Sequence, residues 1–577
     1  MVDAVRWVGQ RALLAEFTAL NGVLALHHYL SEDPLPGQIE AIAAARTVLV
    51  RFRSRRDAVA AVRPLKRLKP KAPELSSAED VEIPVHYDGE DLTTAAEHLG
   101  MSAEALITWH TETQWVGAFG GFAPGFTYCV PAELTHRRRP RRGSHHSLPR
   151  LESPRTSVPA GAVALAGEFS AVYPRSSPGG WQLIGTTDAV MWDLGRPRPA
   201  LITPGTPVRY RPVPERITVR QSPQSSQRPQ GDQNPQNTQR TTTTGGDVVD
   251  ILASGPRTLI EDLGRGGYAD LGVPRSGAAD RAAARQANQL VGNDESAAVF
   301  EVLSGGLELT VQQTAVLAVT GAEAEVEVIT PRPVERSNMA LNGTGAAEEP
   351  LTEDDIRTIP LRAPFWLYPG ERMRLATPTR GLRNYVALSG GIAAPKVLGS
   401  ASADTLSGLG PPPVQAGDTF GLVGAMSRFV GIADVARTAL PEPESPTRLR
   451  IVPGPRDDWF AGPRGRNPGL ERLTGQTWTV SDRADRVGLR LLIDEAGGQP
   501  VPRTREGELP SEPVIRGAVQ VPPSGEPVIF LADHPVTGGY PVIGVVVRED
   551  LGLAAQLPPG TEVRFTAVDP ETLSPLS

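Results

Sequence analysis

The sequence contains little cysteine and few aromatic residues, and each scarcity narrows what the protein can be. Cys129 is the only cysteine among 577 residues, which excludes an internal disulfide and a zinc site built from thiolates. It follows an aromatic residue and has no adjacent base, so we expect a buried structural cysteine. Aromatic residues make up 5% of the chain and apolar residues 40%, so the cores must be built from Ala, Val, Leu and Ile.

The chain also lacks the charge and the apolar runs that particular partners need. Its formal net charge is -7 and its pI about 5.8, which argues against nucleic acid as a partner, because phosphate neutralisation needs a basic face. No stretch of about 20 apolar residues could span a bilayer, and the N-terminus lacks the features of a signal peptide. We therefore expect a cytoplasmic protein without a membrane partner, and homo-oligomerisation stays open.

Common catalytic motifs are missing as well. The sequence has no Gly-Lys-Ser/Thr of a P-loop, no Gly-x-Gly-x-x-Gly between a strand and a helix, and no Gly-x-Ser-x-Gly nucleophile elbow. His145 and His146 have no partner at the spacing of metal ligands. They belong to a basic loop that we interpret as a solvated insertion, with a phosphate-binding patch as the alternative. No metal site is predicted.

The most informative feature that is present is a repeat. Residues 172–185 and 531–544 both end in Gly-Gly, aromatic, any residue, aliphatic, Ile, Gly. Similar blocks flank both copies in the same order, at residues 161–165 and 517–521 before them and at residues 204–210 and 559–565 after them. Three blocks at almost equal gaps indicate two related β modules, each ending in the same strand meander.

The chain divides around these modules. Its length suggests three or four domains, and 59 Gly and 56 Pro favour short strands, so the expected class is mainly β with α+β parts. Residues 216–246 are rich in Gln, Pro and Thr, which predicts a disordered linker. We place the domains at 1–72 (small α+β unit), 73–215 (first β module), 247–445 (first part of a second body) and 446–577 (its second part, with the second β module).

Local patterns predict several elements within this plan. Capping residues and apolar spacing predict helices over residues 18–30, 55–68, 92–99 and 102–109. The loop at residues 120–126, rich in Gly and Pro, either makes a tight turn or brings backbone N–H groups up to a ligand, and the tight turn is favoured.

Residues 262–280 form the densest polar and glycine-rich stretch, and they are the main candidate for a ligand site. Ser276 is predicted to cap a helix over residues 278–291. Arg265, Arg275 and the free N–H groups at that helix start could together hold an anion. The equal alternative is a glycine loop whose arginines are merely solvated.

Taken together, these stretches resemble two subunits of a known enzyme. In the first body, residues 122–126, 154–161 and 177–185 resemble the B subunit of the bacterial ATP-dependent 5-oxoprolinase. The second body resembles the C subunit at residues 262–268, 272–280, 290–295, 389–392, 452–458, 517–525 and 537–541. These subunits are also called allophanate hydrolase subunits 1 and 2. The Kip regulators of sporulation are similar to them, and the same fused pair resembles the carboxyltransferase domain of urea carboxylase.

The resemblance implies a fold and a function. Each module would contain a cyclophilin-like β-barrel, which agrees with the repeat. The chain would be the fused B and C subunits of an enzyme that opens the lactam of 5-oxoproline to glutamate, using ATP with Mg and a separate A subunit. Alone it would be inactive. One alternative is a carboxyltransferase component using biotin carried by another protein, and another is a Kip-type regulator that inhibits a histidine kinase.

The resemblance also implies roles for particular residues. Asp533 or Asp280 could act as a base or hold a metal with ATP, and Arg265 and Arg275 suit anions by bidentate pairing. The motif matches extend the expected substrate- or phosphate-binding set to Tyr268, Ser276, Arg486, Gln520, Thr537, Tyr540, Phe122, Pro124, Gly125, Arg155 and Trp181. None of the four lysines has the Met-Lys-Met context of a biotin carrier, so no covalently bound biotin is expected.

The sequence departs from the family pattern at three places. Tyr128 and the residues after it replace a usual Gly-Gly pair, and Glu168-Phe169 replaces Asn-Gln. In the second body, Asp533-His534 stands where the C subunit commonly has Asp-Arg. The first two changes bear on the contribution of the first body to a site, and the third bears on substrate preference.

Overall fold

The computed structural model describes residues 2–70, 80–136, 146–214, 248–333, 352–424, 428–463, 466–494, 497–507 and 509–576. The predicted linker at residues 216–246 and His145 lie outside the described residues. No helix in the described ranges is long and apolar enough to cross a membrane.

The N-terminal unit is a four-stranded antiparallel sheet with two helices. Its strand order is β1-β2-β4-β3, and the central strand β4 carries a continuous apolar run, Val48 to Val50, that is buried on both faces. Helix α2 begins at a capping box in which Ser54 and Asp57 each accept from the other's backbone N–H. The elements are β1 (Ala4–Trp7), β2 (Ala12–Glu16), α1 (Leu20–Glu32), β3 (Gln38–Ala43), β4 (Thr47–Phe52) and α2 (Arg55–Arg67).

The first β module is a seven-stranded barrel-like sheet. Its order is β12-β9-β10-β7-β6-β13-β5, and a bridge between His86 and Thr186 joins the two end strands. Cys129 is buried in this module, as expected. The elements are β5 (Val81–Val85), α3 (Leu92–His98), α4 (Ala103–Glu112), β6 (Trp115–Gly120), β7 (Thr127–Pro131), α5 (Ala132–His136), β8 (Arg155–Val158), β9 (Ala162–Ala166), β10 (Phe169–Val172), β11 (Ser177–Gly179), β12 (Gln182–Thr186) and β13 (Pro207–Pro212).

The second β module is a closed barrel with the same strand order. It runs β25-β32-β29-β30-β27-β26-β33, and in both modules the last strand lies parallel to the first. The repeat in the sequence therefore corresponds to one topology used twice. The elements are β25 (Thr447–Pro453), η3 (Asp457–Trp459), α7 (Pro468–Gly475), β26 (Trp478–Val480), β27 (Gly488–Ile493), β28 (Glu512–Pro513), β29 (Ala518–Gln520), β30 (Val528–Phe530), β31 (Thr537–Gly538), β32 (Val542–Val546), η5 (Arg548–Asp550), α8 (Leu551–Ala555) and β33 (Glu562–Ala567).

A β-sandwich precedes the second barrel. Its two sheets, β20-β19-β22-β17-β14-β24 and β15-β16-β23-β18-β21, enclose one apolar core, and α6 packs on β18 and β23 from outside. The elements are β14 (Val249–Ser254), β15 (Arg257–Glu261), η2 (Ala269–Leu271), α6 (Arg281–Leu290), β16 (Val299–Leu303), β17 (Leu307–Val311), β18 (Ala315–Glu323), β19 (Val326–Pro333), β20 (Thr352–Ile359), β21 (Pro364–Leu367), β22 (Arg372–Leu375), β23 (Arg380–Leu388) and β24 (Thr419–Phe420).

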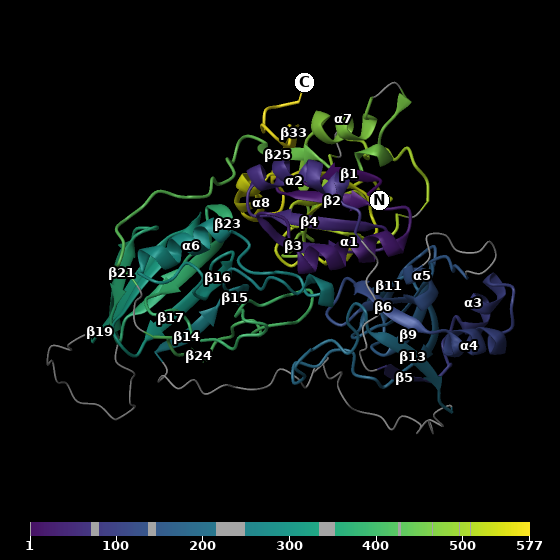
Figure 1. The fold of residues 1–577 in the computed structure, drawn as a ribbon. Coiled ribbons are helices and arrows are strands. Elements are labelled where there is room, and N and C mark those ends of the chain that lie inside the picture. Colours follow the sequence, from purple (N-terminus) through teal and green to yellow (C-terminus); the bar gives the residue numbers. More distant parts are fainter. Residues whose placement is uncertain are drawn as a thin grey trace, which may run out of the picture.

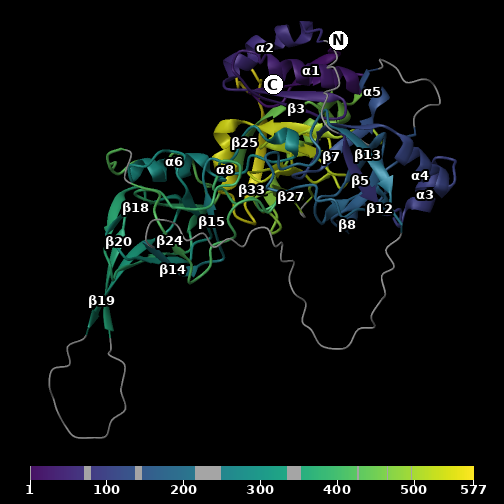
Figure 2. The same ribbon diagram turned by 60° about the horizontal axis from the view of Figure 1, so that its bottom comes forward.

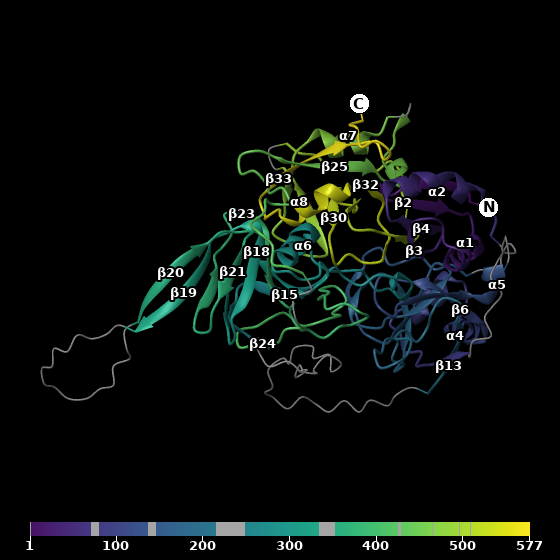
Figure 3. The same ribbon diagram turned by 60° about the vertical axis from the view of Figure 1, so that its left-hand side comes forward.

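The domains are arranged around the second barrel (Figure 1). The N-terminal unit lies against this barrel, with Leu14 and Leu49 in one apolar cluster with Ala518 and Phe530. The first barrel lies below the N-terminal unit, which it contacts through α1 and α5. The sandwich lies on the other side, and the hairpin of β19 and β20 extends away from the rest (Figures 2 and 3). The predicted class, mainly β with two related barrels, is confirmed.

Candidate anion-binding site between the domains

A small cavity lies where the N-terminal unit, the stretch at residues 262–280 and the second barrel meet. Its volume is about 50 Å³, enough for a single small group. We call it the arginine pocket, because its charged and titratable lining residues are Glu40, Arg51, Arg265, Arg275, Arg281, Arg516 and His534. Of these, only Arg265 and Arg275 were expected at an anion site from the sequence. The structure brings both of them to one cavity.

The arginines of this pocket have hydrogen-bonding capacity left over. Arg51 is paired with Glu40 at 2.8 Å between Nη1 and Oε2. Four others each keep a buried nitrogen without a hydrogen-bond partner among the described residues: Nη1 of Arg265 and Nε of Arg275, Arg281 and Arg516. A buried donor without an acceptor costs about 1–3 kcal/mol, and more when charged. An oxyanion in the pocket would supply these acceptors.

Backbone carbonyl groups hold these side chains in place. Arg265 donates from Nε to the carbonyl of Val397 at 3.4 Å and from Nη2 to that of Ser402. Arg281 donates to the carbonyl of Ser276 at 2.7 Å, and Arg516 donates to that of Ala279. Neutral carbonyl partners orient a guanidinium without cancelling its charge. The pocket is therefore preorganised and still strongly positive.

The balance of charge in the arginine pocket favours an anion. Five arginines face one lining carboxylate, an excess of four positive charges (5 − 1). Burial lowers the pKa of Arg516 to about 10, so this guanidinium is still protonated at neutral pH. Burial and the neighbouring Arg51 also lower the pKa of Arg275. Charges crowded in this way repel one another, and a bound anion would relieve the repulsion.

His534 presents a neutral ring to the same pocket. Burial, reinforced by the charges of Arg51, Arg516 and Arg281, lowers the pKa of His534 to about 4. Its Nδ1 lies 2.7 Å from the carbonyl oxygen of Pro535, which can only accept, so Nδ1 carries the hydrogen. Nε2 is therefore an acceptor at neutral pH. It suits a ligand N–H, and a pKa so low makes it a weak base.

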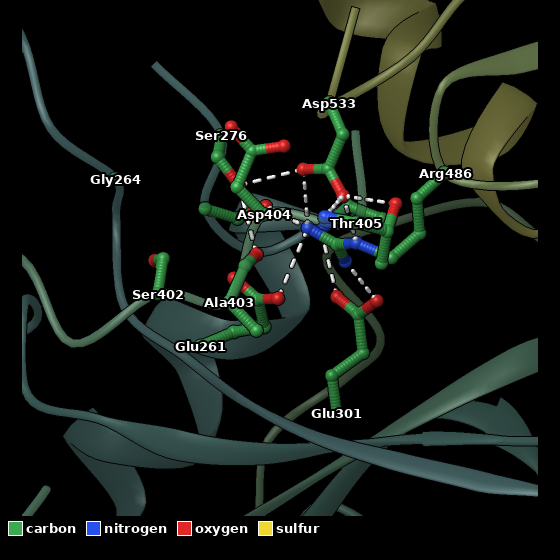
Figure 4. Close-up of polar contacts among 12 residues, drawn as sticks. Glu261, Gly264, Ser276, Glu301, Ser402, Ala403, Asp404, Thr405, Arg486 and Asp533 are labelled. Atoms are coloured by element: carbon green, nitrogen blue, oxygen red, sulfur yellow. Dashed lines mark hydrogen bonds and ion pairs between the residues drawn. The ribbon is translucent and has the colours of Figure 1, made fainter. Parts of the chain in front are cut away.

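Asp533, one of the two predicted catalytic carboxylates, is buried and stands between two residues that line the pocket, Ala532 and His534. Figure 4 shows its polar contacts. It accepts from Arg486 at 2.9 Å and 3.1 Å, from Ser276 Oγ at 2.6 Å, and from the backbone N–H and hydroxyl of Thr405 at 2.9 Å and 2.7 Å. Burial opposes its ionisation, but Arg486 outweighs burial and holds the pKa of Asp533 below its usual value. All its acceptor sites are occupied, which favours a structural role for Asp533.

Arg486 is the centre of this buried network (Figure 4). Besides Asp533, it contacts Glu301, Glu261 at 3.1 Å and the carbonyl of Gly277 at 2.9 Å. Burial raises the pKa of Glu261 well above its usual value, and the charge of Arg486 opposes this rise. Glu301 also accepts from the N–H of Ala279 at 2.7 Å. Arg486 and Glu301 thus hold Gly277 and Ala279 in place. These residues belong to the turn that follows Arg275, so the network helps to position Arg275 in the pocket.

Asp280, the second predicted catalytic carboxylate, is the N-cap of α6. It accepts from the N–H groups of Ala282 and Ala283, both at 3.1 Å, and from the side chains of Thr438 and Gln556. The expectation that Ser276 caps this helix is wrong. Ser276 has a left-handed backbone with φ of 52° and a hydroxyl directed at Asp533, so the helix begins at Arg281. The free N–H groups expected at the pocket are therefore occupied by Asp280.

The predicted residues of the loop at 120–126 lie at an interface between domains. The N–H of Gly125 donates to the carbonyl of Leu271 at 3.0 Å. A Cβ on Gly272, whose φ is 74°, would lie 2.1 Å from the carbonyl oxygen of Ala123. Phe122 packs against Phe126, and neither Phe122 nor Pro124 lines the arginine pocket. This loop joins the first barrel to η2, so it positions the site instead of forming it.

The remaining candidates are held within their own domains. Arg155 pairs with Asp91 at 2.8 Å, and Trp181 belongs to an aromatic cluster with Phe126. In the second barrel, Gln520 donates to the carbonyl of Tyr540 at 3.0 Å, and Thr537 lies in the short strand β31. Tyr268 N-caps η2, and the ring of Tyr540, 43% exposed, lies under Arg503. None of these side chains lines the arginine pocket.

Sequence reasoning missed three arginines of the pocket, Arg51, Arg281 and Arg516. Arg281 and Arg516 stand next to recognised features, the capping Asp280 and the repeat block that begins at Gly517, and could have been found there. Nothing in the sequence indicates that Arg51 belongs to an anion site, because a charged residue on a strand ordinarily faces solvent. No group of three or more potential metal-ligating side chains occurs in the described part of the chain.

Two family models match the chain. The model described as carboxyltransferase domain, subdomain A and B, covers residues 271–567, and the one described as subdomain C and D covers residues 4–202. This chain belongs to the carboxyltransferase-domain family. The boundary between the two models falls between the two bodies, with the linker between them.

Named relatives and a solved structure agree with that division. The second body is 30% identical over 329 residues to the C subunit of 5-oxoprolinase from Escherichia coli K12, a match that spans 55% of this chain and 90% of the relative. The first body is 35% identical over 190 residues to the B subunit from Escherichia coli O157:H7, a match that spans 32% of this chain and 82% of the relative. The crystal structure of TTHA0988 covers 98% of this chain and 100% of its own, with a TM-score of 0.73 and 32% identity. The fused B and C architecture is thereby shown.

Proposed function

We propose that this protein is the fused B and C component of a cytoplasmic, ATP-dependent lactam hydrolase that opens 5-oxoproline to glutamate. Its partner would be a separate protein that resembles the A subunit of 5-oxoprolinase, and we call it the A-type partner. The observation that carries the proposal is the arginine pocket, where four arginines each keep a buried nitrogen without an acceptor among the described residues. The relatives named as the B and C subunits of 5-oxoprolinase, which match the two bodies, support it.

The pocket suits the anionic part of such a reaction. A lactam amide is a poor electrophile, and phosphorylation of its oxygen by ATP would supply the activation. A volume of about 50 Å³ admits one carboxylate or phosphoryl group, which Arg265, Arg275 and Arg516 would hold. Nε2 of His534 would accept from the lactam N–H. Fixed donors of this kind stabilise developing negative charge without reorganising.

The same pocket lacks a group that could complete the reaction alone. Asp533 and Asp280 are buried, and hydrogen bonds occupy them. The pocket's carboxylate, Glu40, is paired with Arg51. A base or nucleophile must therefore come from elsewhere, which supports the need for the A-type partner. ATP with Mg would be a substrate of the assembled enzyme.

The test is ATP-dependent release of glutamate from 5-oxoproline by this chain with and without the A-type partner. Activity should appear only with the partner, and Arg275→Ala should lower it by about 10²-fold, the usual scale for a positioned charge. Arg490→Ala, on the exposed face of β27, is the matched control and should be neutral. Full activity from this chain alone, or none with the partner, would contradict the proposal.

A second candidate function follows from the family models. Both describe carboxyltransferase domains, and a carboxylated intermediate is also an anion that the arginine pocket could hold. In that case biotin would arrive on another protein. Transfer of a carboxyl group between a biotinylated carrier and urea, lost in Arg275→Ala, would support this candidate when 5-oxoproline is not turned over.

A further inference from the structure

A second cavity lies between the sandwich and the second barrel. Its volume is about 470 Å³, and its walls come from β15, β16, the beginning of β23 and the loop at residues 481–487. We call it the interdomain cleft. A volume of this size is typical of sites for organic ligands, whereas the arginine pocket is about 50 Å³. Of these two cavities, the cleft is therefore the one whose volume suits a nucleotide.

One part of the interdomain cleft is apolar. Leu259, Leu303 and Leu382 line it, and Pro256 and Pro559 lie at its edge. Apolar walls of this kind bury a flat ring system. A simple inorganic anion would gain nothing from them.

The other part of the cleft carries free positive charge. Arg257, at the start of β15, and Arg483, on the loop before β27, both line the cleft and are exposed. Among the described residues, neither guanidinium has a hydrogen bond or an ion pair. Asp482 and Asp485 beside them accept only from their own loop. The lining of the cleft has four arginines and three carboxylates, an excess of one positive charge (4 − 3). Two guanidinium groups without a bonded partner next to an apolar wall match a ligand with a ring and a phosphate chain.

We propose that the interdomain cleft binds a nucleoside phosphate, with the base against the leucines and the phosphates on Arg257 and Arg483. The choice of ligand rests on the proposed function, which requires a nucleotide, but the site is defined by the cleft itself. Asp482 and Asp485 also line the cleft, and in this proposal their carboxylates accept from donor groups of the nucleoside.

The buried network connects the cleft to the arginine pocket. Arg486 and Glu301 line the cleft on one side. On the other, Arg486 binds Asp533, the neighbour of His534, and Glu301 binds the N–H of Ala279, whose carbonyl accepts from Arg516. A nucleotide in the cleft would thus act on the pocket through these side chains, without direct contact.

Titration calorimetry with ADP on the full chain tests the inference without partner or substrate. ADP should bind, and Arg257→Ala and Arg483→Ala should each weaken binding by about tenfold, as expected for loss of one charged hydrogen bond. Arg490→Ala, an exposed arginine of β27 outside the cleft, is the matched control and should leave the ADP affinity unchanged.

Three outcomes would overturn the inference. The first is that ADP does not bind the chain, and the second is that the two cleft variants bind ADP as tightly as the unmodified chain. The third is that pyrophosphate binds as tightly as ADP, which would show that the apolar walls contribute nothing. The readout is binding, so it can succeed when turnover of 5-oxoproline fails, and the reverse also holds.

Discussion

The two barrels share one strand order but differ at the positions where their loops meet other domains. Aligning the repeats places Arg516-Gly517 opposite Ala160-Gly161, and Asp533-His534 opposite Pro174-Arg175. In the second barrel, Arg516 and His534 line the arginine pocket. In the first, Arg175 donates to the carbonyl of Leu406 in the sandwich. Equivalent loop positions thus form a site in one barrel and an interdomain contact in the other.

The buried polar groups of the two barrels also differ: those of the first barrel are neutral, and those of the second are charged. In the first barrel, His110 stacks on Tyr210 with 4.2 Å between ring centroids and bonds Tyr87 and Ser170, all neutral groups. In the second, Arg486 is charged and paired with carboxylates from two domains. A neutral network stabilises a single domain, whereas a charged one also ties the second barrel to the sandwich.

The largest expected effect comes from breaking the charged network. Arg486→Met should lower the free energy of unfolding by about 3–5 kcal/mol, because it leaves the buried carboxylate of Asp533 without its cation and leaves Glu301 with only Arg383, at 3.7 Å. Thermal and urea unfolding measure it. Arg490→Met, on the exposed face of the same barrel, should shift stability by no more than about 0.5 kcal/mol. Equal effects would show that the network contributes no specific stability.

The next effect concerns the position at which the barrels differ most, Arg516 against Ala160. Arg516→Ala should lower the rate of the reconstituted enzyme by about 10²-fold, because it removes a guanidinium that has an unused donor in the pocket. Arg516→Lys should restore part of the charge but not the geometry, and so recover only part of the rate. A rate unchanged in Arg516→Ala would place the reaction outside the arginine pocket.

A smaller effect should follow from loosening the contact of the first barrel. Gly272→Ala puts a Cβ at 2.1 Å from the carbonyl oxygen of Ala123. Gly205 also has a positive φ, 89°, but open space around it, so Gly205→Ala carries only the backbone strain. The first variant should lose about 1–3 kcal/mol more than the second, measured by thermal unfolding. Equal losses would mean that the close approach is not needed for docking.

The last effect is a pH dependence to which each barrel contributes one histidine, about 2 kcal/mol each between pH 7 and pH 5. Burial lowers the pKa of His110 to about 3 and that of His534 to about 4, while the unfolded value is near 6.5. Below about pH 6.5 the unfolded chain binds protons that the folded chain does not, so stability falls as pH falls toward these values. His110→Gln and His534→Gln should each flatten this slope, compared with His28→Gln at an exposed position. Unfolding measured from pH 7 to pH 5 checks it.

Much of the local structure follows from short patterns in the sequence. Ser102 marks a real helix start, because its hydroxyl accepts from an N–H group that the first turn leaves free. Thr18, expected to begin the first helix, does not cap it: the helix begins at Leu20, and the hydroxyl of Thr18 donates to Asp3. The rule failed at Ser276, where the hydroxyl bonds Asp533, 257 residues away, and Asp280 caps the helix. A distant partner overrides a local preference when it is charged and buried.

The sequence alone determined that there are two related β modules, where they lie, and which family they resemble, since repeats and motifs are local and survive without knowledge of the fold. It also pointed to Arg265 and Arg275. Only the tertiary structure decided that Arg51, Arg281 and Arg516 join them, and that Asp533 and Asp280 are occupied by hydrogen bonds. The physical reason is that a pocket between three domains depends on how they pack, and packing is set by contacts between residues hundreds of positions apart.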